Sequence, residues 1–264
     1  MNVNLLALLS ICAYLGGSAC LIKGFCQQPK RFIAIYSAWL AVIVHFIYLG
    51  VVFLQMNYFN FSLFNTASLI SALVVLLLLL ASLTKPVEKL GLVIFPFTAL
   101  LLALDVIFPD KYSSFQSYSW QMNAHIFSSI IAFSLLSIAA LQALFLAIQE
   151  KQLRCHPPRK FILNLPALQT MESLLFQMIT IGLIFLSTSL LTGVLFIEDL
   201  FAQHLVHKTV LSIVAWLIFS ALLTGRLNYG WRGQTAVRFT LVGFLLLLLA
   251  YFGSKLVLEV ILNK

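Results

Sequence analysis

Four histidines of this sequence stand at the start of, or within, long apolar segments, where their ring nitrogens could bind a metal. His125 and His207 each open such a segment, His204 precedes His207 by one helical turn, and His45 lies inside another segment. Neutral imidazole binds haem iron and other transition metals. Imidazoles from two helix starts on one membrane face would reach opposite faces of a planar iron cofactor, each nitrogen about 2 Å from the iron. The pattern is therefore compatible with a haem that has two histidine ligands, and spacing alone does not establish one.

The same histidines allow other interpretations. His204 and His207 share a helix face, and with Glu198 and Asp199 nearby they would suit a divalent metal such as zinc, nickel or cobalt. A histidine inside a membrane span is costly and is by default a functional-site hypothesis. His45 would also be stable as a neutral imidazole that is hydrogen-bonded to Ser or Thr of a neighbouring helix.

The elements that must position these side chains are membrane helices. Of the 264 residues, 62% are hydrophobic and 9% are charged, whereas soluble domains carry about 25% charged residues. Apolar runs of about 20 residues, long enough to cross a bilayer core of about 30 Å, recur along the sequence. They predict an all-α, polytopic membrane bundle of about eight transmembrane helices, a single transmembrane domain over 1–264 with no soluble domain. The predicted spans are 3–22, 32–54, 62–84, 90–108, 125–149, 173–197, 209–225 and 239–261.

Basic residues gather in alternate connectors between these spans. Twelve of the sixteen Lys and Arg residues lie in four connectors, and the other four are Lys111, Lys208, Lys255 and Lys264. Because cytoplasmic connectors carry the excess of Lys and Arg, both termini are predicted to lie outside. Membrane orientation thus explains the formal net charge of +8, and no nucleic-acid partner is expected. The basic connectors are 23–31, 84–89, 151–160 and 226–238, and His156 in the third is interpreted as a solvated loop residue.

The remaining polar residues give no sign of catalysis. The sequence contains no recognisable nucleophile–base pair, phosphate-binding glycine loop or pair of catalytic carboxylates, so the protein is predicted not to be an enzyme. Asp105, near the outer end of a span, is interpreted as a counter-ion for Lys111 or Lys208. The segment PALQTMES at 166–173 is expected to form a short helix along the membrane surface.

Three segments carry a resemblance to a known family. They are SLFNTASLISAL at 62–73, AHIFSSIIAFSLLSIAAL at 124–141, and the C-terminal part in which GWRG at 230–233 is followed by VGFLLLLLAYFGS. Through them the sequence resembles the cytochrome c assembly protein family, which includes CcsA and CcmC, over essentially its whole length. The family's tryptophan-rich signature is absent, because IEDLFAQHLVHK at 197–208 has no tryptophan, and this favours the YpjD branch, with HemX as a related protein.

The resemblance implies a function and a location. A protein of this kind would bind or handle haem b at the outer face of a bacterial inner membrane, in contact with the lipid bilayer and with other cytochrome-assembly or haem-biosynthesis proteins. Two other functions stay open. One is a divalent-metal transporter or its accessory subunit, and the other is a membrane regulator of haem biosynthesis that acts through a soluble partner of the 151–172 loop.

The resemblance also implies roles for individual residues. His125 matches a family haem ligand by position and flanking sequence. The family's second histidine has no counterpart here, because the corresponding segment reads SKLVLEVILNK at 254–264. His207, or less directly His204, is expected to supply the second ligand because it lies on the same side of the membrane, and not because it matches a family motif. His45 corresponds to a membrane-embedded histidine of the family and would be an inner transit ligand. The aromatic residues Tyr118 and Trp120 would form walls of the haem site, or else belong to an interfacial aromatic belt.

Overall fold

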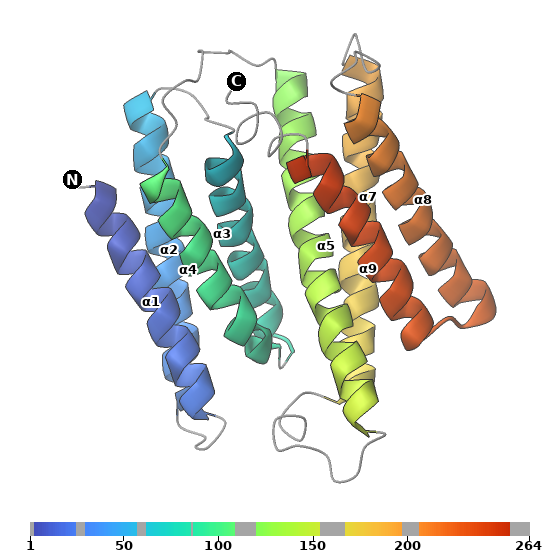
Figure 1. Cartoon of the computed structure of the whole chain (residues 1–264), viewed down its shortest axis with the longest axis horizontal. Helices are drawn as coiled ribbons and strands as arrows, with labels where there is room; N and C mark the ends of the chain where they lie inside the picture. The colour runs from blue at the N-terminus through green and yellow to red at the C-terminus, as the bar shows by residue number, and fades with distance from the viewer. Residues whose placement is uncertain are drawn as a thin grey trace. The chain divides into compact units, whose positions relative to one another are not determined.

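The computed structural model describes residues 3–24, 30–56, 62–85, 87–108, 120–153, 167–196 and 206–253. All regular elements within these residues are helical, which confirms the all-α prediction (Figure 1). Eight of the described helical segments are long and apolar enough to cross a membrane, so the predicted polytopic membrane bundle is also confirmed. The direction of the chain across the membrane, with both termini outside, stays a prediction.

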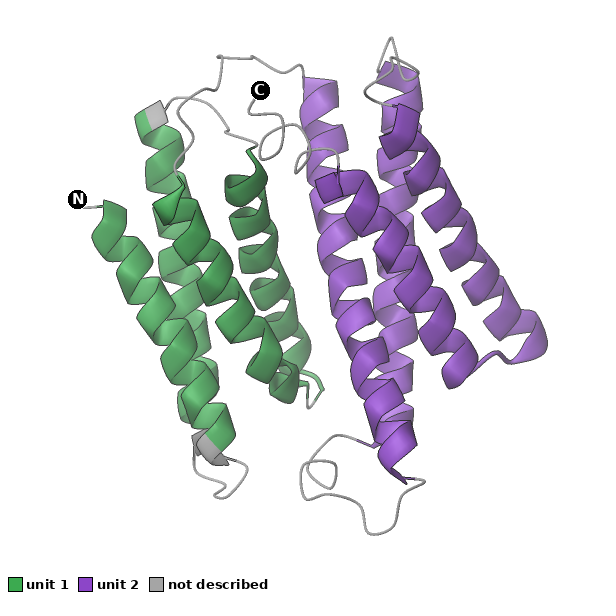
Figure 2. Ribbon diagram, viewed as in Figure 1, with its two compact units in different colours: residues 1–117 green, residues 118–264 purple. Residues whose placement is uncertain are grey.

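Residues 1–117 form the first of two compact units (Figure 2). Its helices are α1 (Val3–Gly24), α2 (Lys30–Met56), α3 (Leu63–Ser82), the short 3-10 helix η1 (Glu88–Leu90) and α4 (Gly91–Ile107). α1 packs against α2 and α4, and α3 packs against the same two helices, so the four long helices close a ring. Gly17 permits the close approach of α1 to α2, because a Cβ atom there would lie 2.8 Å from Ser37 Oγ.

Residues 118–264 form the second unit. Its helices are α5 (Trp120–Leu153), α7 (Leu168–Phe196), α8 (Val206–Tyr229), α9 (Gln234–Leu248) and the π-helix η2 (Leu249–Gly253) that continues α9. α5 packs against α7 and α9, and α8 packs against the same two helices, which closes a second ring. Gly182 of α7 meets Leu136 of α5, since a Cβ at this glycine would lie 2.9 Å from Leu136 Cγ. The single transmembrane domain over 1–264 stays a prediction.

Two boundaries differ from the sequence-based expectation. The fifth span begins at Trp120 rather than at 125, so His125 lies in the second turn of α5 and not at its first residue. The segment 166–173 was expected to form a separate surface helix, and this is wrong, because Leu168 already opens α7, which continues without a break to Phe196. Glu172 is only 3% exposed there, since its carboxylate is held by arginines of a neighbouring hairpin.

Candidate functional site

The imidazole of His125 is held by a hydrogen bond between α5 and α7. Its Nδ1 lies 2.8 Å from the backbone carbonyl oxygen of Ser189. A carbonyl oxygen only accepts hydrogen bonds, so Nδ1 must carry the proton and donate it. In the neutral ring the other nitrogen, Nε2, is then unprotonated and has a lone pair available for a metal.

Hydroxyl groups surround this histidine and reinforce the contact between the two helices. Ser129 Oγ donates to the carbonyl oxygen of His125 at 2.7 Å and lies 2.6 Å from Ser189 Oγ. Because Ser129 has one proton, Ser189 then donates its own hydroxyl proton to Ser129. Thr192 Oγ1 lies 2.9 and 3.0 Å from the carbonyl oxygens of Thr188 and Ser189, which share its single proton, and 3.4 Å from His125 Nδ1. The backbone and ring of His125 are therefore both fixed.

The other nitrogen of this ring remains available. His125 is half-buried, and its Nε2 has no hydrogen-bond partner in the part of the chain that the structure describes. Ligating histidines usually donate their second ring N–H to a carbonyl or carboxylate, which fixes the tautomer and orients the ligating nitrogen. A protonated Nδ1 that is hydrogen-bonded and an Nε2 with a lone pair therefore fit ligation of a metal such as haem iron by His125.

Aromatic rings lie at the same end of these two helices. Trp120 is the first residue of α5 and lies about 7 Å along the helix axis from His125. The centroid of its ring is 6.3 Å from that of Phe196, the last residue of α7. The Trp120 side chain is 72% exposed, so its ring is free to contact a large apolar ligand. Tyr118 lies outside the described residues.

His207 lies in the first turn of α8 and is exposed. α8 is joined to α7 where Trp216 Nε1 donates to Ser187 Oγ at 2.8 Å. The bonded pair Trp216 and Ser187 serves as a common reference level on the two helices. At 1.5 Å per residue, His207 lies about 13 Å from Trp216 toward the start of α8. Ser189, the partner of His125, lies about 3 Å from Ser187 toward the end of α7. The two helices run in opposite directions (Figure 1). His207 is therefore offset by roughly 10 Å toward the helix ends relative to His125.

His45 lies in the first unit, in a buried polar cluster. The residue is 0% exposed, its Nε2 lies 2.9 Å from Ser68 Oγ on α3, and its Nδ1 lies 3.3 Å from the Tyr14 hydroxyl on α1. The expected hydrogen bond to a serine of a neighbouring helix is confirmed. Ligation of haem by His45 stays a prediction, and it would require one of these two hydrogen bonds to break.

Asp105 of α4 accepts a hydrogen bond, missed by sequence reasoning, from Tyr48, which lies one helical turn after His45 on α2. The Tyr48 hydroxyl on α2 donates to Asp105 Oδ2 at 3.2 Å, and the carboxylate is buried. The expectation of a lysine counter-ion stays a prediction, and Lys111 lies outside the described residues. The contact with Tyr48 depends on the packing of α2 beside α4, which no sequence pattern specifies.

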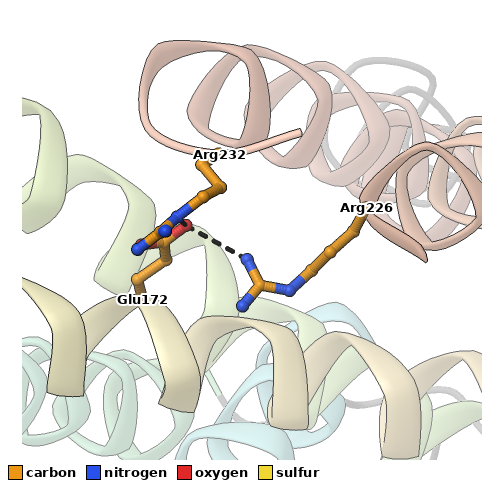
Figure 3. Close-up of polar contacts among 3 residues, drawn as sticks. All are labelled: Glu172, Arg226 and Arg232. Atoms are coloured by element: carbon orange, nitrogen blue, oxygen red, sulfur yellow. Dashed lines mark hydrogen bonds and ion pairs between the residues drawn. The ribbon is translucent and has the colours of Figure 1, made fainter. Parts of the chain in front are cut away.

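A second polar centre lies at the opposite end of α7 from Ser189. Glu172 accepts from Arg226 Nη1 at 3.1 Å and from Arg232 through Nε and Nη2 at 3.1 and 3.0 Å (Figure 3). Its carboxylate raises the pKa of Arg232 through these hydrogen bonds and its negative charge, so that guanidinium stays charged. Sequence reasoning missed Glu172, although it directly precedes an apolar run with no other carboxylate before Glu198.

The divalent-metal interpretation involves residues that the structure does not describe. His204, Glu198 and Asp199 all lie outside the described residues. Within the described ranges, no group of three or more His, Cys, Asp or Glu side chains is arranged to hold a metal ion. The metal interpretation therefore stays a prediction from the sequence.

Comparison with known proteins agrees with the fold. The family model described as cytochrome C assembly protein matches residues 32–262. The chain is 34% identical, over 97% of its length and 98% of the relative's, to a protein of Escherichia coli K12 named inner membrane protein YpjD. It is also 29% identical to the cytochrome c biogenesis protein CcsA of Chlamydomonas reinhardtii, over 53% of this chain and 39% of that protein. No solved structure matches significantly.

These matches identify the family of the protein and the membrane in which it lies. A relative that covers nearly the whole chain is named an inner membrane protein, and eight described helices are apolar enough to span a bilayer. The predicted location as a multi-pass inner-membrane protein and the predicted likeness to the YpjD branch and to CcsA are confirmed. Since the family model covers far more than half of the sequence, the chain belongs to the cytochrome c assembly protein family.

Proposed function

We propose that this protein binds haem b at the end of its second unit where α5 and α8 begin, and that it handles haem without transforming it. The observation that carries the proposal is the hydrogen bond from His125 Nδ1 to the Ser189 carbonyl oxygen, at 2.8 Å. This bond leaves Nε2 as the ligating nitrogen and makes it a better ligand. Family membership supports the link to haem, because cytochromes c are haem proteins and a relative is named for their biogenesis.

His207 is the proposed second axial ligand. Two axial nitrogens bind opposite faces of one haem, each about 2 Å from the iron, so their side chains must stand apart with the iron between them. The offset of roughly 10 Å along the helices between His125 and His207 agrees with such an arrangement. His204, one turn earlier in the chain, is the alternative second ligand. The bound iron would supply a redox-active centre, and the chain supplies its ligands and their orientation.

Aromatic side chains are proposed to cover the porphyrin. Trp120 is exposed beside Phe196, and Tyr118 precedes Trp120 in the chain. A porphyrin is a flat apolar ring, and contact with indole and phenyl faces removes apolar surface from water. His45 is proposed as a transit ligand on the way to this site. Partner proteins of cytochrome assembly or haem biosynthesis belong to the same proposal, whereas regulation of haem biosynthesis through a soluble partner is an alternative to it.

Haem binding is tested by purifying the protein from haem-sufficient cells and recording oxidised and reduced absorption spectra. The wild type is expected to show a Soret band with sharp α and β bands, as a low-spin haem with two histidine ligands does. His125→Ala and His207→Ala are expected to lose the haem or to become high-spin. His156→Ala, in a predicted cytoplasmic connector, is the control and is expected to keep the wild-type spectrum.

Two outcomes would overturn the proposal. One is a folded wild-type preparation that contains no haem and takes up no added hemin. The other is a haem spectrum that survives loss of His125. If the haem-free protein instead carried a divalent metal that disappears on replacing His204 and His207, the metal-transporter function would take its place.

A further inference from the structure

The hairpin between α8 and α9 is a compact turn with a fixed shape. Gly230 and Gly233 have φ values of +65° and +54°, a region that favours glycine. The Trp231 N–H donates to the Gly225 carbonyl oxygen at 3.2 Å, which folds the turn back onto the end of α8. The Trp231 ring packs beside Phe239 of α9, with centroids 5.0 Å apart. The two glycines and these contacts therefore fix the positions of Trp231 and Arg232, which lie between the glycines.

The hairpin and the start of α9 carry three arginines, Arg226, Arg232 and Arg238, beside two carboxylates, Glu172 and Glu150, of which Glu150 accepts from Gln234 Nε2 at 2.9 Å. Arg226 and Arg232 both bind the single carboxylate of Glu172 (Figure 3). The Arg226 guanidinium also lies 3.8 Å from the centroid of the Phe176 ring. A guanidinium has five N–H donors, and Glu172 receives only one from Arg226 and two from Arg232. Within the described residues, the other donors of both groups have no hydrogen-bond acceptor. Arg238, exposed in α9, adds a further charge.

Apolar and aromatic surface is exposed beside these charges. Leu227 is 84% exposed and Tyr229 is 78% exposed, and both lie in the last turn of α8. The Arg232 side chain is 61% exposed. The hairpin joins two spans, Val206–Tyr229 and Gln234–Gly253, so these side chains stand at a face of the membrane. Tyrosine and arginine side chains each combine an apolar part with a polar end, which suits the boundary between lipid headgroups and acyl chains.

We infer that the α8–α9 hairpin is a binding site for an anionic phospholipid. The N–H groups of Arg226 and Arg232 that do not bind Glu172 are the proposed donors for the phosphate, since planar guanidinium groups bind phosphate oxygens through paired hydrogen bonds. Arg238, in the second turn of α9, is proposed to add a further donor. Tyr229 and Leu227 provide contact for the glycerol and the first part of the acyl chains. Glu172 does not compete with the lipid, because its buried carboxylate fixes the two arginines from the side of the protein. Basic sites of this kind beside membrane helices recognise anionic headgroups.

The test uses the purified full-length protein in neutral detergent and native mass spectrometry with added phosphatidylglycerol or phosphatidylcholine. Wild-type protein is expected to bind phosphatidylglycerol roughly fivefold or more tightly than phosphatidylcholine. Arg238→Gln and Tyr229→Ala leave the Glu172 contacts in place and are each expected to reduce that preference severalfold. Lys208→Gln makes the same charge change at the opposite end of α8 and is expected to keep the wild-type preference. Unchanged helical circular dichroism shows that the variants are folded.

Four results would overturn the inference. Equal affinity for phosphatidylglycerol and phosphatidylcholine would show that the charge of the headgroup does not contribute to binding. An equal loss of preference in Lys208→Gln would show a general effect of net charge. Glycerol 3-phosphate that binds as tightly as phosphatidylglycerol, or an acidic soluble protein that binds the hairpin in place of lipid, would assign the charges to a partner outside the membrane.

Discussion

His125 of α5 donates its Nδ1 proton to the backbone carbonyl oxygen of Ser189 on α7, across 2.8 Å. This bond joins the two most closely packed helices of the second unit and leaves Nε2 as the unprotonated nitrogen of the neutral ring. Because the acceptor is backbone, replacement of the Ser189 side chain cannot remove it. The consequences of the bond must be tested through the histidine and through the hydroxyls around it.

The tautomer of His125 can be measured without any haem. The hydrogen bond to Ser189 requires that Nδ1 is protonated and Nε2 is not. Nitrogen NMR of haem-free protein with labelled histidine is expected to show this pattern for the signal that disappears in His125→Gln. A signal from the opposite tautomer, with Nε2 protonated, would contradict the proposed role of His125 while leaving the fold intact.

Ser129→Ala is expected to destabilise the contact between α5 and α7. The change removes the 2.6 Å hydrogen bond between Ser129 Oγ and Ser189 Oγ, and interhelical hydrogen bonds in membranes contribute about 0.5–1 kcal/mol. Ser137→Ala is the matched control, because among the described residues Ser137 Oγ bonds only the Phe133 carbonyl of its own helix. In unfolding by a denaturing detergent, the free energy of unfolding should be lower for Ser129→Ala than for Ser137→Ala. Equal free energies of unfolding would show that the Ser129–Ser189 bond contributes nothing.

His45→Gln is expected to lower stability and leave the resting haem spectrum unchanged. Both ring nitrogens of His45 are hydrogen-bonded, to Tyr14 and to Ser68, so neither is free to ligate iron in the described conformation. Loss of one of these buried bonds should cost about 1–3 kcal/mol of unfolding free energy. Tyr14→Phe, which removes only the longer of the two bonds, should cost less. A low-spin haem signal that vanishes in His45→Gln would make His45 a resting ligand and contradict this expectation.

Glu172→Gln is expected to loosen the α8–α9 hairpin. The glutamate accepts charged hydrogen bonds from Arg226 and Arg232, and a buried hydrogen bond to a charged group contributes about 1.5–3 kcal/mol. Arg232→Lys keeps the charge but loses the paired hydrogen bonds, so a smaller loss of stability should follow. Hydrogen exchange of the backbone amides between Arg226 and Val237 measures the loosening. Exchange that is unchanged in Glu172→Gln would show that the turn and the packing of Trp231 hold the hairpin without Glu172.

The sequence predicts the helices well and their contacts poorly, for physical reasons. Each span is an apolar run of about 20 residues, a signal contained within the segment itself. The contacts His125–Ser189 and Glu172–Arg232 join residues that are 64 and 60 positions apart, so they depend on how two helices are aligned. The backbone carbonyl that binds His125 is present in every residue and leaves no trace in the sequence. For His45, the type of partner could be predicted because a buried imidazole needs a hydrogen bond, but Ser68 itself could not.

Ligation of haem by His125 is tested most directly with His125→Gly and added imidazole. If His125 Nε2 binds the iron, the variant should lose the low-spin spectrum of the wild type, and free imidazole should restore it by entering the vacated position. His156→Gly with the same imidazole should show no change at any step. A His125→Gly protein that keeps the wild-type spectrum without imidazole would contradict the account.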